Sequence, residues 1–163
     1  MPSKHATLVQ LKASGLAETE AIARQLAPLL RAGDVVALDG GLGAGKTAFA
    51  RALVNALPGA PEDVPSPTFT LVQTYARGEI EVWHFDLYRL EDPDEAFELG
   101  IEDAFVEAVS LIEWPDRLGP YLPKAHLRVT LTEGENEAMR DITFSGDPAW
   151  AERLKGVFIG GDA

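Results

Sequence analysis

A glycine-rich stretch that ends in a lysine and a threonine runs from residue 40 to residue 47, with the letters GGLGAGKT. It fits the pattern G-x-x-x-x-G-K-[ST], in which backbone N–H groups surround phosphate oxygens. The lysine supplies a mobile positive charge for the β- and γ-phosphates, and the threonine hydroxyl can join the shell of a Mg²⁺ ion. The sequence therefore predicts a phosphate-binding loop made of Gly40, Gly41, Leu42, Gly43, Ala44, Gly45, Lys46 and Thr47.

Two acidic residues that follow apolar stretches are candidates to complete such a site. Glu113 closes the run 109–112, and Asp86 follows the alternating stretch 80–85. Ligands of open α/β sheets bind at the carboxyl ends of strands, so either acid could reach the magnesium or orient an attacking water. The alternative for each is a carboxylate that only caps a neighbouring turn. Asp39, just before the loop, is instead expected to make a local backbone hydrogen bond.

The elements around the glycine-rich loop support its interpretation. Residues 35–38 are a short apolar run, as expected of a buried strand. Residues 46–57 place apolar side chains on one helical stripe and end at a Pro-Gly pair. A strand, a glycine-rich loop and a helix in succession are the context in which this motif holds phosphate. The candidate catalytic residues are therefore the lysine of the motif and the two acids: Lys46, Asp86 and Glu113.

The remaining patterns predict an α/β fold: a P-loop NTPase-like mixed sheet flanked by helices, with antiparallel hairpins, in a single domain over residues 1–163. Asp92-Pro93 and Asp147-Pro148 each predict a helix start, because aspartate caps a helix and proline suits its first position. The further expected elements are helices over 19–31 and in short pieces through 106, strands over 68–75, 80–85 and 109–112, and an antiparallel pair over 125–132 and 139–145.

Composition limits the partners. Fourteen Lys and Arg against 26 Asp and Glu give a formal net charge of −12, which opposes direct binding to a phosphate backbone. A basic partner protein or plain solubility explains such a surface. The chain has no cysteine, which excludes disulfides and favours a reducing compartment. It shows neither an apolar leader nor a run of about 18 apolar residues, so we expect a cytoplasmic protein without membrane contact.

Four short motifs together resemble a known family. They are LGAGKT at 42–47, SPTFTLV at 66–72, HFDLYRL at 84–90 and EWP at 113–115. In this order and spacing they are similar to the TsaE family, the small ATPase component of the bacterial machinery that makes threonylcarbamoyladenosine on tRNA. The resemblance runs from about residue 14 to residue 140.

The resemblance implies an activity and its partners. Proteins of this family bind ATP and Mg²⁺ and act with TsaD and TsaB, which carry the transfer chemistry, so tRNA is met only indirectly. By position, residues 42–47 would take the phosphates, Thr47 and Glu113 would bind magnesium, and Asp86 would be the active-site acid.

Three further positions are implied by the same resemblance. Residues 66–70 would form a loop that senses nucleotide or partner, residues 14–19 would lie near the base, and Arg140 would reach the nucleotide. One position departs from the family, which commonly carries an acidic residue where this chain has Gly41. Any role of that acid is therefore in doubt here.

Two other functions stay open from the residues alone. A small-molecule kinase uses the same phosphate loop but also needs a substrate pocket and usually an arginine-bearing lid, and no lid stands out. A nucleotide-dependent binding switch would fit the D-x-x-G match at 116–119, although no N-K-x-D motif is present to read guanine. The scattered His5, His84 and His126 lack metal-ligand spacing and are expected to be structural or exposed.

Overall fold

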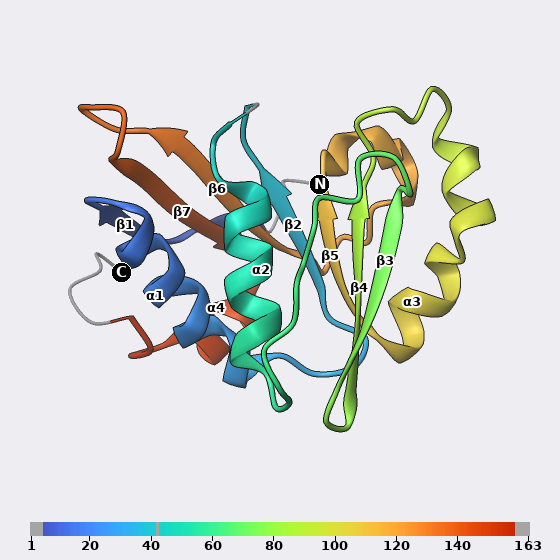
Figure 1. Cartoon of the computed structure of the whole chain (residues 1–163), viewed down its shortest axis with the longest axis horizontal. Coiled ribbons are helices and arrows are strands. Elements are labelled where there is room, and N and C mark those ends of the chain that lie inside the picture. The colour runs from blue at the N-terminus through green and yellow to red at the C-terminus, as the bar shows by residue number, and fades with distance from the viewer. Residues whose placement is uncertain (1–4, 42, 159–163) are drawn as a thin grey trace.

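The computed structural model describes residues 5–41 and 43–158, and among these residues seven strands form one mixed sheet (Figure 1). Across the sheet the order is β1-β7-β6-β2-β5-β4-β3. The strands are β1 (Ala6–Ala13), β2 (Val35–Asp39), β3 (Val72–Arg77), β4 (Ile80–Asp86), β5 (Val109–Glu113), β6 (Leu127–Glu133) and β7 (Arg140–Gly146). Within the described ranges no helix is long and apolar enough to cross a lipid bilayer.

The centre of the sheet is parallel and its two sides are antiparallel. Strand β2 pairs in parallel with β5 and with β6, and β5 pairs in parallel with β4. On one side β7 runs antiparallel to both of its neighbours, β6 and β1, and on the other side β3 and β4 form an antiparallel hairpin. The carboxyl ends of β2, β5 and β4 therefore meet at one edge of the sheet, as in other open α/β sheets.

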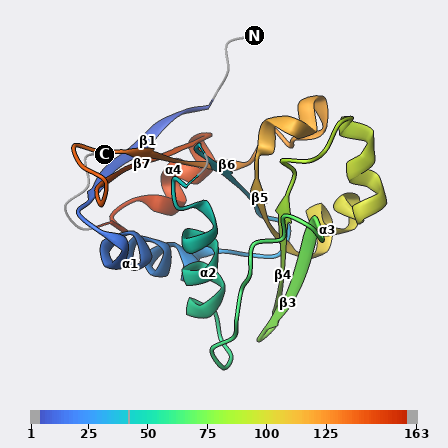
Figure 2. The same cartoon turned by 45° about the horizontal axis from the view of Figure 1, so that its top comes forward.

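Helices cover both faces of the parallel centre. Helices α1 (Leu16–Leu26) and α2 (Lys46–Ala56) lie side by side on one face of the sheet (Figures 1 and 2). Helix α3 (Ile101–Glu107) packs on the opposite face, beside β5 and β4. The other helices are the short 3₁₀ helices η1 (Ala27–Leu29), η2 (Pro93–Leu99) and η3 (Pro115–Tyr121), and α4 (Pro148–Leu154) after β7.

Two apolar cores result, and β2 contributes to both. Val36 and Leu38 belong to the larger core, which includes α1 and α2, while Val35 belongs to the smaller core under α3 and η3. Because successive side chains of a strand point to opposite faces, a strand covered on both sides must be apolar throughout. This explains the uninterrupted apolar run of β2, and the burial of β2 on both faces holds the point at which the glycine-rich loop begins.

A buried arginine holds the segment that connects α2 to β3. The Arg77 side chain is 2% exposed, and its guanidinium donates to the carbonyl oxygens of Leu57 and Ala60 and to the Glu62 carboxylate, at 3.0, 2.7 and 2.7 Å. Farther along, Val64 is fully buried and its carbonyl accepts from Arg51 Nε at 3.3 Å. The segment is therefore anchored to the sheet and to α2 before it reaches the edge where β2, β5 and β4 end.

Most elements agree with the sequence-based prediction. The structure confirms the central strand, the helix after the glycine-rich loop, the short helical pieces through residue 106, the hairpin β3–β4 and the antiparallel pair β6–β7. The Asp92 and Asp147 side chains accept from backbone N–H groups at the starts of η2 and α4, as their Asp-Pro pairs predict.

Two predictions of local structure are wrong, and one strand was missed. The strand expected from residue 68 begins at Val72, because the chain turns there: Leu71 has a φ of 69°, and its N–H donates to the Pro67 carbonyl. The helix expected over 19–31 starts earlier and passes into a 3₁₀ turn that contains Pro28. Strand β1 was not predicted at all, although Val9, Leu11 and Ala13 alternate with polar residues as in a half-buried strand.

Candidate functional site

Three neighbouring strands end in one row at the edge of the sheet. In the parallel ladders Leu38 of β2 is paired with Glu113 of β5, which in turn is paired with Asp86 of β4. Adjacent strands lie about 4.8 Å apart, so two carboxylates that end neighbouring strands lie close to each other and to the loop that follows β2. The two acids predicted from the sequence are thus brought together beside the glycine-rich loop.

The glycine-rich loop joins β2 to α2 in a tight path. Gly40 has a φ of 151°, and a Cβ placed there would lie 2.6 Å from the backbone oxygen of Leu131 on β6. Gly43 and Gly45 also have positive φ values, and α2 begins at Lys46 directly after Gly45. The start of a helix presents backbone N–H groups and a partial positive charge, which suits an anion. Leu42, which the sequence also assigns to this loop, lies outside the described residues.

Lys46 is folded back along its own loop. Its Nζ donates to the carbonyl oxygens of Gly40 at 2.6 Å and Gly41 at 3.2 Å. The same Nζ lies 3.8 Å from the centre of the Trp114 ring, within the range of a cation–π contact. Trp114 has a φ of 58° and follows β5 directly, which turns its indole toward the loop. The lysine therefore sits at the site, with an aromatic face against it.

The electrostatics around Lys46 oppose one another. Lys46 is 5% exposed, and this burial lowers the pKa of its ammonium group. The negative charges of Glu113, Asp86 and Asp39 act in the opposite direction and favour the charged form. The acids at the strand ends therefore help to keep a cation in a partly dehydrated position.

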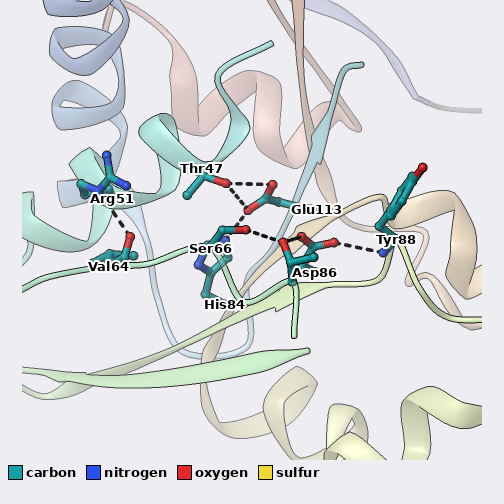
Figure 3. Close-up of polar contacts among 9 residues, drawn as sticks. Thr47, Arg51, Val64, Ser66, His84, Asp86, Tyr88 and Glu113 are labelled. Atoms are coloured by element: carbon teal, nitrogen blue, oxygen red, sulfur yellow. Dashed lines mark hydrogen bonds and ion pairs between the residues drawn. The ribbon is translucent and has the colours of Figure 1, made fainter. Parts of the chain in front are cut away.

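Thr47, Glu113 and His84 form a buried polar chain (Figure 3). The Thr47 hydroxyl lies 3.2 Å from Oε1 and 3.1 Å from Oε2 of Glu113, and it donates to this carboxylate. His84 Nε2 lies 2.7 Å from Oε2 of the same carboxylate, and the histidine and glutamate side chains are 0% and 4% exposed. The two residues predicted to hold magnesium, Thr47 and Glu113, are therefore in direct contact.

Asp86 is held by a second set of contacts (Figure 3). Its Oδ1 accepts from the backbone N–H of Tyr88 at 3.0 Å, and its Oδ2 accepts from the Thr68 hydroxyl at 3.1 Å. The Ser66 and Thr68 hydroxyl oxygens are 2.7 Å apart. The loop predicted to sense nucleotide or partner is thus tied to the acid at the end of β4. Asp86 also caps the turn at Tyr88, so the turn-capping contact that the sequence offered as the alternative is made as well.

These residues border one cavity of about 280 Å³. The glycine-rich loop and the start of α2 line it together with Ser66, Thr68 and the two acids. Its lining consists of Gly43, Ala44, Gly45, Lys46, Thr47, Ala48, Ser66, Thr68, Asp86, Glu113 and Trp114. The cavity therefore combines loop amides, one ammonium group, three hydroxyls and two carboxylates.

Arg140 contacts the glycine-rich loop from its other side. From the start of β7 its Nε donates to the Ala44 carbonyl at 3.0 Å, and Nη2 donates to the Gly43 carbonyl at 3.3 Å. A second cavity, of about 270 Å³, lies here and is lined by Leu16, Thr19, Ala44, Gly45, Glu137, Ala138 and Arg140. The stretch 14–19 and Arg140, both predicted to lie near the nucleotide, therefore meet at one cavity next to the loop.

Three further residues lie at or near the site, and the sequence analysis anticipated the role of only one of them. Asp39 accepts from the N–H of Gly40 at 3.0 Å, as predicted, and also pairs with Arg128. Sequence reasoning missed His84 and Trp114 as residues of the site. A signal existed for His84, because it stands two residues before Asp86 in an alternating strand and must share its face.

Arrangement and topology define a class of protein. A parallel strand, a glycine-rich loop and a helix, beside acids at the ends of two neighbouring strands, make this a P-loop NTPase-like α/β fold with a mixed sheet. The crystal structure of YdiB from Bacillus subtilis superimposes with a TM-score of 0.74 at 31% identity and covers 92% of each chain.

Comparison of sequences gives the family. The family model for threonylcarbamoyl adenosine biosynthesis protein TsaE matches residues 13–142. A tRNA threonylcarbamoyladenosine biosynthesis protein TsaE from Rickettsia conorii is 40% identical over 119 residues, 73% of this chain and 68% of the relative. The protein of the same description from Bacillus subtilis is 39% identical over 130 residues, 78% of this chain and 79% of the relative. The chain belongs to the TsaE family, which takes part in threonylcarbamoyladenosine biosynthesis on tRNA.

Proposed function

We propose that this chain is a Mg²⁺-dependent ATPase that supports threonylcarbamoyladenosine modification of tRNA together with TsaD and TsaB. One observation carries the nucleotide assignment: the Thr47 hydroxyl meets the buried Glu113 carboxylate at the mouth of the phosphate loop. A hydroxyl and a carboxylate oxygen in this position are the protein ligands that a nucleotide-bound Mg²⁺ ion uses.

The donor set at this position fits magnesium. The part of the chain that the structure describes holds no group of three or more His, Cys, Asp or Glu side chains able to bind a metal by themselves. Mg²⁺ characteristically keeps several waters and takes one or two protein oxygens together with substrate phosphates. Thr47 and Glu113 would hold the ion, which would neutralise charge that develops on the phosphates during transfer.

The phosphates would be bound by the loop amides and by Lys46. In the structure Lys46 Nζ is within 3.2 Å of two loop carbonyls and lies against the Trp114 ring, so it is close to the loop before any ligand is added. A polyphosphate would exchange these carbonyl contacts for contacts with anionic oxygens, which are stronger because they are charge-assisted.

Asp86 would orient the attacking water. Both of its oxygens already accept one hydrogen bond each, from Tyr88 N–H and the Thr68 hydroxyl, and each carboxylate oxygen can accept another. These bonds fix the plane of the carboxylate at the edge of the cavity. A hydrogen-bond acceptor held still near the γ-phosphate is what positioning of a water requires.

The second cavity would take the base and sugar. Its lining mixes the apolar side chains of Leu16, Ala44 and Ala138 with the polar groups of Thr19, Glu137 and Arg140. Such a mixture suits an aromatic base with a few polar edge groups. Arg140 would lie near the nucleotide while it holds the outer carbonyls of the phosphate loop.

The charge of the chain supports an indirect role toward tRNA. With a formal net charge of −12, the surface repels a nucleic-acid backbone, so the RNA would be held by the partner proteins. A cytoplasmic location follows from this proposal, since the tRNA and the partners of such a reaction are found there.

Hydrolysis of ATP by the purified protein, measured with and without TsaD and TsaB, tests the proposal. Lys46→Ala should reduce turnover by at least a hundredfold, because the charge that compensates the γ-phosphate is lost. Lys124→Ala, which removes an exposed lysine remote from both cavities, is the matched control and should keep wild-type turnover.

Three outcomes would contradict the proposal. Turnover of the Lys46 variant close to wild type would remove the assigned site. Turnover that is the same with and without the partner proteins would remove the coupling to tRNA modification. If phosphate appears on an added metabolite instead of in solution, the chain is a kinase.

A further inference from the structure

Among the described residues, the fully buried His84 ring has the Glu113 carboxylate as its one hydrogen-bond partner. Its side chain is 0% exposed, and Nε2 lies 2.7 Å from Glu113 Oε2. The other ring nitrogen, Nδ1, has no hydrogen-bond partner within the described part of the chain. A buried polar atom without a partner is destabilising relative to an apolar side chain of similar shape. Packing alone therefore favours a different residue at this position.

The contact has a defined direction. An ionised carboxylate offers only acceptors, so the hydrogen between the two atoms belongs to His84 Nε2. The Thr47 hydroxyl also donates to this carboxylate and approaches both of its oxygens. Glu113 thus receives one donor from the sheet beneath it and one donor from helix α2. Its plane is fixed from two sides.

The backbone makes this arrangement rigid. His84 and Glu113 lie on adjacent parallel strands, where His84 is paired with Leu111 two residues before the glutamate. Both side chains point to the same face of the sheet because strand residues two apart share a face. Neither residue stands on a loop, so the distance between them is set by strand pairing.

We propose that His84 is a positioning residue that holds the Glu113 carboxylate in the orientation needed to bind Mg²⁺. This inference rests on the proposed function and extends it, because it assigns to the metal ligand the neighbour that orients it. Partners that orient a metal-binding carboxylate typically change metal affinity or activity 10- to 100-fold when they are removed. His84 would act in this way without touching the nucleotide.

Substitution of His84 by two amides of different length tests the role. His84→Gln places its amide nitrogen close to the position of Nε2, whereas His84→Asn is too short to reach Glu113. In the Asn variant we expect the Mg²⁺ concentration for half-maximal hydrolysis to rise about 10- to 100-fold. The Gln variant should recover most of that loss. Nucleotide affinity measured in EDTA should be unchanged in both, which a general loss of structure would not produce.

His126→Gln is the matched control, because His126 is the other buried histidine of the described chain and lines neither cavity. It should leave the Mg²⁺ dependence of hydrolysis as in the wild type. Equal Mg²⁺ dependence of the folded His84→Asn variant and the wild type would overturn the inference.

A measurement without metal or nucleotide separates this inference from the proposed function. The ¹⁵N resonances of the His84 ring should report a protonated, hydrogen-bonded Nε2 in the metal-free protein, and Glu113→Ala should shift them. Ring signals that do not respond to Glu113→Ala would overturn the positioning role. Absence of Mg²⁺-dependent hydrolysis in the wild type, with the shift present, would instead overturn the proposed function.

Discussion

Alanine at Gly40 should destabilise the fold through two independent effects. The new Cβ would lie 2.6 Å from the Leu131 backbone oxygen and 3.0 Å from the Ala44 Cβ, both closer than an ordinary contact. Relief of such overpacking costs about 1–3 kcal/mol. The residue would also have to keep a φ of 151°, a region that costs a side chain about 1–3 kcal/mol more. Together the loss is about 2–6 kcal/mol, a large share of the stability of an ordinary domain.

Urea unfolding followed by circular dichroism would measure this loss, and Gly41→Ala is its control. A Cβ at Gly41 meets no atom within 4 Å and Gly41 is absent from the positive-φ glycines, so that variant should stay within about 0.5 kcal/mol of the wild type. Equal midpoints for the two variants would refute the reasoning. The same open space would accommodate the acidic side chain that the family resemblance implies at this position.

Three further predictions concern charge and capping. Burial lowers the pKa of His126, so the fold should lose stability as the pH falls below about 6.5, and His126→Gln should flatten that loss in unfolding curves taken between pH 7 and 5. Burial also lowers the pKa of Lys46, so nucleotide affinity followed by calorimetry should decline at a lower alkaline pH than an ordinary lysine would give. Asp92 caps η2 through the N–H of Asp94, so Asp92→Ala should cost about 1 kcal/mol in thermal unfolding while Asp92→Asn costs little.

The central elements were predictable because local and tertiary preferences agree there. Strand β2 is buried on both faces and reads as a continuous apolar run, and the glycines after it allow the positive φ values that the loop adopts. Both Asp-Pro pairs cap helices because a capping interaction is made within a few residues. Such signals need no knowledge of distant contacts.

Elsewhere the tertiary structure overrides local preference. Residues 68–71 have the composition of a strand, yet the contact of Thr68 with Asp86 and the turn at Leu71 divert them from the sheet. Strand β1 alternates weakly between polar and apolar residues, and it is stabilised by its pairing with β7, more than a hundred residues later in the chain.

The candidate site divides in the same manner. The glycine-rich loop was predictable from its motif, and Asp86 and Glu113 were predictable from their places at the ends of strands. The structure brings all three to one cavity. The contact of His84 with Glu113 depends on which strands are neighbours, and the place of Trp114 depends on the left-handed turn after β5. A single sequence specifies neither of these, although strand alternation puts His84 on the face of Asp86.

The buried Arg77 gives the connection between α2 and β3 a fixed half and an adjustable half. An arginine stays charged at any pH at which the protein folds, so its hydrogen bonds to the carbonyl oxygens of Leu57 and Ala60 do not respond to acidity. Beyond Val64, side-chain hydrogen bonds run through Ser66 and Thr68 to Asp86. A ligand that competes for Asp86 would therefore release only the part of the connection after Val64. The β3–β4 hairpin would keep its protection against amide hydrogen exchange.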